Sequence, residues 1–144
     1  MARKPLRSFL LMCCALIFSA CADQAPRPTV RAAWARPAGK GMNSAIYMQV
    51  QNGSQADALI GASSEAAQMV QIHQTVINAD GVAEMKPQSR IELAPGEVLE
   101  LKPGGYHIML MDVFQPLLVG DSLDVTLLFE EAGEVHVQVP VKTD

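Results

Sequence analysis

The chain has 144 residues, of which 49% are hydrophobic, 5% aromatic and 18% charged. This length and composition support one domain with an ordinary core, and they exclude two full domains or a mainly disordered chain. The 11 Lys and Arg residues are outnumbered by 15 Asp and Glu, and no local basic cluster offsets the formal net charge of −4, so nucleic acid is not an expected partner.

Residues 1–21 are predicted to be a secretion signal. Three basic residues precede the apolar run 9–18, which is too short to remain in a bilayer as a permanent helix. Residues 18–21, Phe-Ser-Ala-Cys, resemble a bacterial lipobox, although Phe stands where Leu is usual. We expect cleavage before Cys21 and a lipid on that cysteine, and an ordinary signal peptidase site nearby is the alternative.

The predicted domain, residues 30–144, contains no cysteine. Cys13 and Cys14 leave with the signal, and Cys21 becomes the first residue of the mature chain. The domain therefore cannot hold a disulfide, a thiolate nucleophile, a zinc ribbon or a blue-copper site. Residues 22–29 are predicted to be a tether, and residues 30–144 to be a single domain in the periplasm or cell envelope, whose only contact with the membrane is a lipid on Cys21.

Short β-like stretches separated by turn residues follow one another along the domain. No stretch indicates a helix longer than about two turns, and residues 61–69 are the best candidate for a short one. Many short strands at turn spacing indicate an all-β, antiparallel sandwich or barrel with Greek-key connections. The predicted strands are 30–35, 45–50, 58–63, 69–77, 82–85, 90–93, 98–101, 106–111, 123–129 and 135–141.

The predicted strand 106–111 places a histidine and a methionine on the same face. Period-two alternation assigns Tyr106, Ile108 and Leu110 to the core face, and it assigns His107 and Met109 to the opposite face. The Cα atoms of His107 and Met109 are then about 6.5–7 Å apart. Both side chains can therefore converge on one metal ion.

A second pair of candidate ligands lies on the predicted strand 69–77 and the chain that follows it. His73 has the opposite phase to Val70 and Ile72, so it also faces away from the core. Met85 follows a turn at 78–81 and returns along a hairpin-like excursion. We expect this return to bring the thioether of Met85 towards His73.

Two imidazoles and two thioethers favour Cu(I). Thioether sulfur is soft and uncharged, and it offers little to Ca²⁺, Mg²⁺ or Zn²⁺. Outside the cytoplasm thiols tend to be oxidised to disulfides, whereas Met resists that fate and still binds a soft ion. A carrier with neutral ligands also holds Cu(I) less tightly than thiolates do, so it can transfer the ion.

Other histidines and methionines have simpler interpretations. His136 is expected to be an ordinary surface residue, and Met48 is expected to pack in the core. The roles of Met42, Met69 and Met111 stay open, although Met111 continues the ligand face. Catalytic motifs such as Gly-x-Ser-x-Gly, His-Glu-x-x-His and a Walker loop do not occur, so we do not expect an enzyme.

The spacing of these ligands strongly resembles that of the periplasmic copper chaperone family PCu(A)C. In that family a histidine, usually followed by Met, precedes ten residues, a Met, twenty-one residues and His-x-Met. His73 and Gln74 here precede ten residues, Met85, twenty-one residues and His107-Ile108-Met109. Gln74 stands where Met is common. The resemblance also covers residues 33–37, 52–53, 101–111, 115–117 and 132–135.

The resemblance implies a cupredoxin-like β-sandwich that holds one Cu(I) through His73, Met85, His107 and Met109. It also implies delivery towards the binuclear copper centre of cytochrome c oxidase, often alongside a Sco-type thiol protein. Two alternatives come from other classes: a β-sandwich interaction module without a metal role, and a copper electron-transfer protein, whose expected thiolate is missing.

Overall fold

A computed structural model of the chain describes residues 27–143. The predicted signal 1–21, with the lipid expected on Cys21, and most of the predicted tether lie outside the described residues, and the first strand already begins at Thr29. Within residues 27–143, no helix is long and apolar enough to cross a membrane.

The described residues form ten strands, which agree with the ten predicted segments to within two residues at each end. Alternating apolar residues and well-placed turn residues explain this agreement, because both signals are local. The strands are β1 (Thr29–Ala35), β2 (Ser44–Gln51), β3 (Asp57–Ser63), β4 (Ala67–Ile77), β5 (Ala83–Pro87), β6 (Ile91–Leu93), β7 (Val98–Leu101), β8 (Tyr106–Val113), β9 (Ser122–Phe129) and β10 (Gly133–Pro140).

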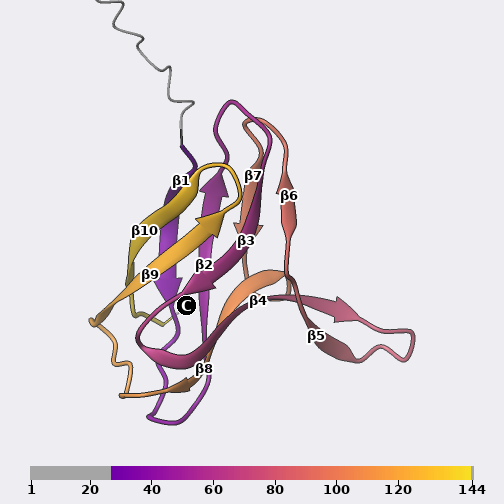
Figure 1. Cartoon of the computed structure of the whole chain (residues 1–144). Coiled ribbons are helices and arrows are strands. Elements are labelled where there is room, and N and C mark those ends of the chain that lie inside the picture. Colours follow the sequence, from indigo (N-terminus) through magenta and orange to yellow (C-terminus); the bar gives the residue numbers. More distant parts are fainter. Residues whose placement is uncertain (1–26, 144) are drawn as a thin grey trace, which may run out of the picture.

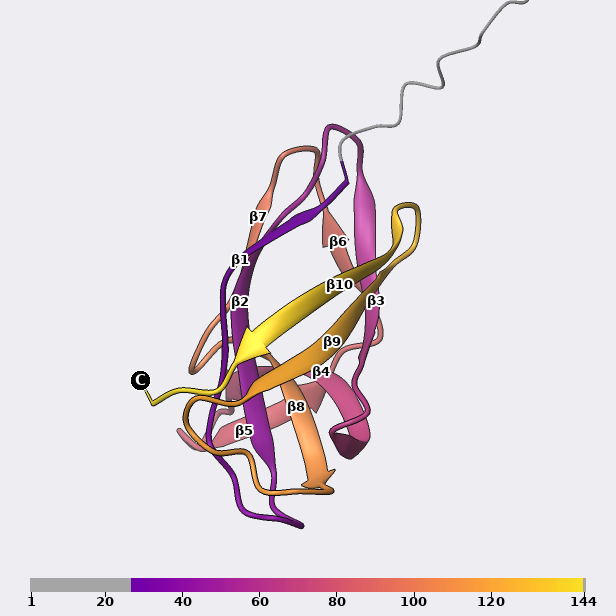
Figure 2. The same cartoon turned by 90° about the vertical axis from the view of Figure 1, so that its left-hand side faces the viewer.

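Two sheets pack face to face, as Figures 1 and 2 show from two sides. One has six strands in the order β1-β2-β7-β8-β4-β5, and the other has four in the order β10-β9-β3-β6. The chain crosses between the sheets several times, and nearly all pairings are antiparallel; the exception between named strands is β7 with β8. The predicted antiparallel, cupredoxin-like β-sandwich is confirmed.

The short helix predicted over residues 61–69 is wrong. β3 continues to Ser63, a turn follows, and β4 begins at Ala67. The Oγ of Ser64 accepts a hydrogen bond from the N–H of Ala66 at 3.3 Å and donates to the carbonyl oxygen of Asp124 at 2.7 Å. A serine side chain that bonds the nearby backbone stabilises a turn in place of a helix.

The core lies between the sheets and consists of aliphatic side chains with Phe129 and Met48. Met48 is 1% exposed, which confirms that it packs. On β8 the core side chains Ile108 and Leu110 are fully buried, as the alternation predicted. The alternate side chains of β8 therefore lie on the other face of the six-stranded sheet, outside the core.

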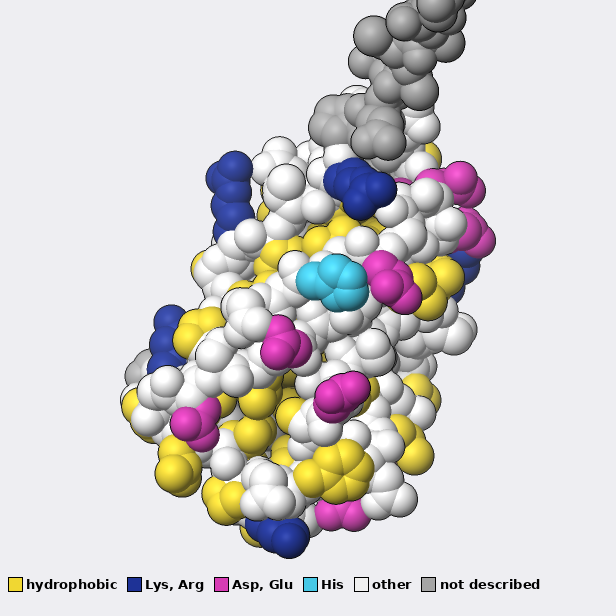
Figure 3. Space-filling model, turned by 60° about the vertical axis from the view of Figure 1, so that its left-hand side comes forward, with side chains coloured by type: hydrophobic (Ala, Val, Ile, Leu, Met, Phe, Trp, Pro, Cys, Tyr) yellow, Lys and Arg dark blue, Asp and Glu magenta, His cyan; other side chains and the backbone are white. Residues whose placement is uncertain are grey.

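The surface shown in Figure 3 carries acidic and basic side chains dispersed singly, and exposed hydrophobic side chains gather towards its lower end. The loops that join β1 to β2 and β8 to β9 lie at this end of the sandwich (Figure 2). Exposed hydrophobic residues of these loops are Met42, Phe114, Leu118 and Val119.

Asn52 ties the loop after β2 to the end of β6. Its side-chain amide donates to the carbonyl oxygens of Gln55, Leu93 and Ala94 at 2.8, 3.1 and 2.9 Å. Its Oδ1 accepts the N–H of Gly53 at 2.8 Å. The Asn52 side chain is 5% exposed, and it forms hydrogen bonds with four backbone groups, three carbonyl oxygens and one N–H. These bonds join the loop after β2 in one sheet to the end of β6 in the other.

We predict that Asn52→Ala lowers the free energy of unfolding by about 1–3 kcal/mol, because buried carbonyl groups lose their donor. Urea denaturation measures this as a lower midpoint with an unchanged slope. An unchanged midpoint would contradict the structural role given to this amide.

Candidate metal centre

A tight turn sets the phase of β8 and so the direction of His107. The N–H of Gly105 donates to the carbonyl oxygen of Lys102 at 3.0 Å, and the N–H of Lys102 donates to Tyr106 at 2.8 Å. Gly104 adopts a φ of +76°, which a residue with a Cβ rarely adopts. Pro103-Gly104-Gly105 therefore forms the turn that leads into the His107 strand.

The predicted hairpin between His73 and Met85 also forms. The turn closes through Asn78, whose Oδ1 accepts the N–H groups of Asp80 and Val82 at 3.0 and 2.9 Å. β5 then pairs with β4 so that Met85 lies opposite Thr75. In Figure 1 this hairpin extends to the right, away from the body of the sandwich.

β4 and β8 pair with His73 directly opposite His107. Directly opposed residues of an antiparallel pair share one face of the sheet, so both imidazoles lie on the outer face. Their ring centroids are 5.8 Å apart with an edge-to-face angle of 73°, and Tyr47 on β2 lies 6.4 Å from the His107 ring. The rings of β2, β8 and β4 thus form a continuous row.

Three of the four candidate ligands line one cavity of about 370 Å³. Met85, His107 and Met109 reach it from β5 and β8. The fourth candidate, His73, does not line the cavity and lies edge-to-face against the His107 ring. The two histidines are 9% and 3% exposed, whereas Met85 is 56% exposed. The other lining residues come from β2, its preceding loop, Thr75 and the turn before β8: Arg36, Pro37, Asn43, Ser44, Ala45, Tyr47, Thr75, Pro103 and Gly104.

Each imidazole has one nitrogen occupied and one free of partners. Nδ1 of His107 donates to the carbonyl oxygen of Gly105 at 3.2 Å, and Nε2 of His73 donates to Oε1 of Gln71 at 3.1 Å. Nε2 of His107 and Nδ1 of His73 are buried without a hydrogen-bond partner. Buried polar atoms are normally satisfied, so these two unpartnered nitrogens are candidates for binding a ligand. A hydrogen bond at the second ring nitrogen is the usual support of a metal-binding histidine.

Burial, together with the neighbouring charge of His107, lowers the pKa of His73 below its usual value. The ring is therefore neutral at neutral pH, with a lone pair on the nitrogen that bears no hydrogen. A neutral imidazole is the form that binds a metal.

The four candidate ligands are all uncharged groups. Within residues 27–143, no group of three or more His, Cys, Asp and Glu side chains is arranged to hold a metal ion. The candidate donors are therefore the two imidazoles and the thioethers of Met85 and Met109. Such a set suits Cu(I) and not Ca²⁺ or Mg²⁺.

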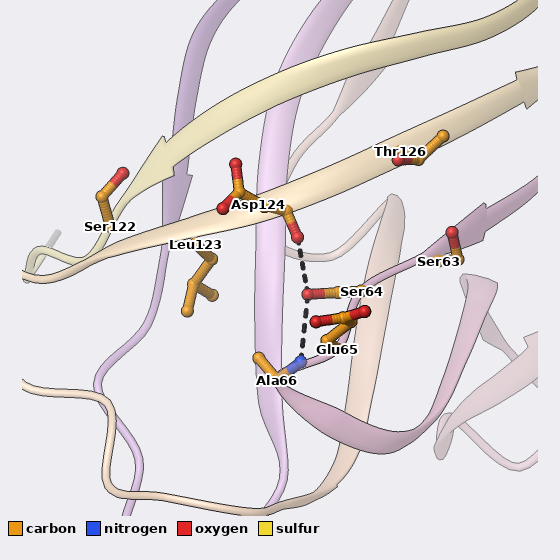
Figure 4. Close-up of a pocket in the computed structure, with 8 residues that line it drawn as sticks. All are labelled: Ser63, Ser64, Glu65, Ala66, Ser122, Leu123, Asp124 and Thr126. Atoms are coloured by element: carbon orange, nitrogen blue, oxygen red, sulfur yellow. Dashed lines mark hydrogen bonds between the residues drawn. The ribbon is translucent and has the colours of Figure 1, made fainter.

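A second, larger pocket of about 560 Å³ has a different chemistry. Figure 4 shows hydroxyl and carboxylate groups around it, including Ser64, Glu65 and Asp124. The dashed lines there are the hydrogen bonds that Ser64 makes across the turn. Neither His nor Met lines this pocket, so it does not provide soft ligands.

Sequence reasoning did not identify the partners that orient the imidazoles. Gln71 lies two residues before His73 on the same face, so its position could have been found from the alternation. The carbonyl oxygen of Gly105 carries no residue-specific signal, because every residue has one. His136 lies on the exposed face of β10 beside Thr126 and Glu134, as predicted.

Comparisons with known proteins identify the family of the chain. Residues 28–141 match the family model "LpqE-like". The chain is 38% identical over 119 residues to "Putative lipoprotein Lxx21020" of Leifsonia xyli subsp. xyli (strain CTCB07), which covers 83% of this chain and 72% of that protein. The chain belongs to this family.

Two solved PCuAC-type structures have the same fold. The copper-bound PCuAC domain from PmoF2 is 30% identical, with a TM-score of 0.67, and the match covers 83% of this chain and 96% of that domain. The Cu(I) form of DR1885 from Deinococcus radiodurans is 28% identical, with a TM-score of 0.60 over 86% of this chain and 84% of that protein. The family member described here therefore has relatives that were solved with copper bound.

We predict that the metal-free protein holds His107 as the Nδ1–H tautomer and His73 as the Nε2–H tautomer. Long-range ¹⁵N–¹H correlation NMR at neutral pH distinguishes the two forms. Gln71→Leu removes the acceptor of His73, so its ring is expected to become a mixture of tautomers while His107 stays unchanged. The reverse tautomers in the unmodified protein would contradict the assignment of the free nitrogens.

Proposed function

We propose that this protein is an extracytoplasmic copper chaperone that binds one Cu(I) through His73, Met85, His107 and Met109 and delivers it by ligand exchange. The observation that carries the proposal is the pair of buried imidazole nitrogens without partners, Nδ1 of His73 and Nε2 of His107, beside a cavity lined by two thioethers. The copper bound to the PmoF2 and DR1885 relatives supports it.

In this proposal the imidazoles and the thioethers have different roles. The imidazoles are buried and oriented by hydrogen bonds, so they give the ion a fixed position. The thioether of Met85 lies on an exposed hairpin and reaches the cavity from outside. A recipient protein can therefore approach the ion from the Met85 side while the imidazoles still hold it.

Release of the ion needs no chemical change in the protein. All four ligands are uncharged with or without the ion, so this protein gains or loses neither a proton nor an electron in the exchange; a thiol of the recipient releases its own proton when it binds Cu(I). Neutral ligands hold Cu(I) less tightly than thiolates, and a thiol or thiolate recipient can therefore take the ion. A protein with this role is a carrier and not an enzyme, in line with its copper-binding relatives.

The place of action is the periplasm or cell envelope. The signal-like residues 1–21 and the lipoprotein name of the relative from Leifsonia xyli support this location, with Cys21 as the lipidated residue. By the family resemblance, the recipient is the binuclear copper centre of cytochrome c oxidase, with a Sco-type protein acting on the same centre.

We predict that the protein binds one equivalent of Cu(I) tightly and that His107→Ala and Met109→Leu each weaken this binding. Loss of a supporting group around a metal costs 10- to 100-fold in affinity, so loss of a direct ligand is expected to cost at least about tenfold. Anaerobic titration against a competing chelator measures the affinity.

His136→Ala is the matched control, because this histidine is exposed on β10 and bonds Thr126. Its variant is expected to bind Cu(I) as the unmodified protein does. X-ray absorption of the loaded protein is expected to show both nitrogen and sulfur ligands. Undiminished affinity in the His107 and Met109 variants would reject the site and favour an interaction module.

We predict that the loaded protein transfers Cu(I) to the isolated, metal-free copper domain of cytochrome c oxidase subunit II. The thiolates of that centre bind Cu(I) more strongly than thioethers do, which drives the transfer. Separation of the two proteins followed by metal analysis measures it. Copper that stays on the chaperone, with and without a Sco-type protein, would remove this recipient while leaving the binding site intact.

A further inference from the structure

Two methionines with no role in the proposed site lie beside it on the same face of the six-stranded sheet. Met69 on β4 is directly opposite Met111 on β8, in the same ladder that places Gln71 opposite Met109 and His73 opposite His107. The outer face of β4 and β8 therefore carries three cross-strand pairs in succession. From the proposed site outwards these are His73/His107, Gln71/Met109 and Met69/Met111.

Packing in the core does not account for these thioethers. Met69 is 51% exposed, and Met109 and Met111 are half-buried. None of the three belongs to the core cluster or to the partly buried side chains that pack against it. By contrast, Leu110 between Met109 and Met111 is fully buried. Large apolar side chains on the outer face of a sheet need another explanation when they occur together.

The three sulfur atoms are within reach of one ion. Directly opposed residues have Cβ atoms about 4.5–5.5 Å apart, which applies to Met69 and Met111. Met109 and Met111 are two residues apart on one strand, so their Cα atoms are about 6.5–7 Å apart. A methionine side chain has three rotatable bonds, and its sulfur can adjust to a shared ligand.

We propose that Met69 and Met111, with Met109 as a shared ligand, form a second and weaker Cu(I) site on the outer face of β4 and β8. This inference rests on the proposed function, because Met109 also belongs to the site with the two imidazoles. Three thioethers without an imidazole make a softer and more exposed site, and only soft monovalent ions are expected to bind there.

The shared methionine gives the ion a stepwise route between the two sites. The bonds from Cu(I) to the sulfurs of Met69 and Met111 break as bonds form to the nitrogens of His107 and His73, and Met109 stays bound throughout. The ligands are neutral in both sites, so neither a proton nor an electron is transferred. Copper can thus enter at the thioethers and move along the ladder to the imidazoles.

The test is a titration of the purified protein with Cu(I) or Ag(I) beyond one equivalent, observed by NMR of ¹³C-labelled methionine methyl groups. We expect the first equivalent to shift Met85 and Met109. The second, weaker equivalent is expected to shift Met69 and Met111 and to shift Met109 again, because its sulfur then bridges the two ions. In M69L/M111L the second event is expected to disappear, while the first dissociation constant stays within about twofold because its imidazoles are unchanged.

The same pair of substitutions in an H73A/H107A background separates this inference from the proposed function. Without imidazoles the weak thioether binding is expected to remain, and the added M69L/M111L substitutions are expected to abolish it. Met42→Leu is the matched control, since Met42 is 61% exposed in the loop before β2 and lies outside the ladder.

Each outcome has a definite meaning. A protein that binds only one equivalent, a second event that survives in M69L/M111L, or an equal loss in M42L would overturn the second site. A first event that is unaffected by H73A/H107A would instead overturn the proposed function. Retention of the first event together with loss of the second in M69L/M111L supports both.

Discussion

The pairing of β4 with β8, which places His73 opposite His107, is the constraint on which the whole site depends. A shift of one residue in this pairing would turn one imidazole into the core and the other to the surface. The register is held by Ile72, Ile108 and Leu110, which are buried on the opposite face of the same strands. The site is therefore maintained by the packing of the core and not by the ligands themselves.

The second feature that distinguishes the site is a pair of buried imidazole nitrogens without hydrogen-bond partners. The core satisfies its polar groups, and Asn52 shows how thoroughly it does so between the two sheets. The two imidazoles are an exception, because each keeps one buried nitrogen without a partner. Such an arrangement costs free energy, and under the proposed function a metal ion bound to both nitrogens would recover that cost. The metal-free protein would then be less stable than one in which both nitrogens had partners.

The sequence was sufficient to predict the strands and the residues that approach the cavity, and the reasons are local. Alternation identified the face of His107 and Met109, and the turn residues at 78–81 identified the reversal between β4 and β5. The helix predicted over 61–69 failed because Ser64 bonds to Asp124, sixty residues away, which no local pattern records. The burial of both imidazoles was not predicted either, because the two rings contact each other only through the pairing of β4 with β8, which are separated along the chain.

The hairpin of β4 and β5 also constrains how the length of this chain can vary between related proteins. Met85 faces the cavity because it pairs with Thr75, two positions from His73 on the same strand. Adding a single residue to one arm would reverse the face of every side chain beyond it and carry the sulfur away from the imidazoles. Insertions in this hairpin keep Met85 opposite Thr75 only if the same number of residues is added to β4 and to β5, or if the extra residues lie in the loop between them.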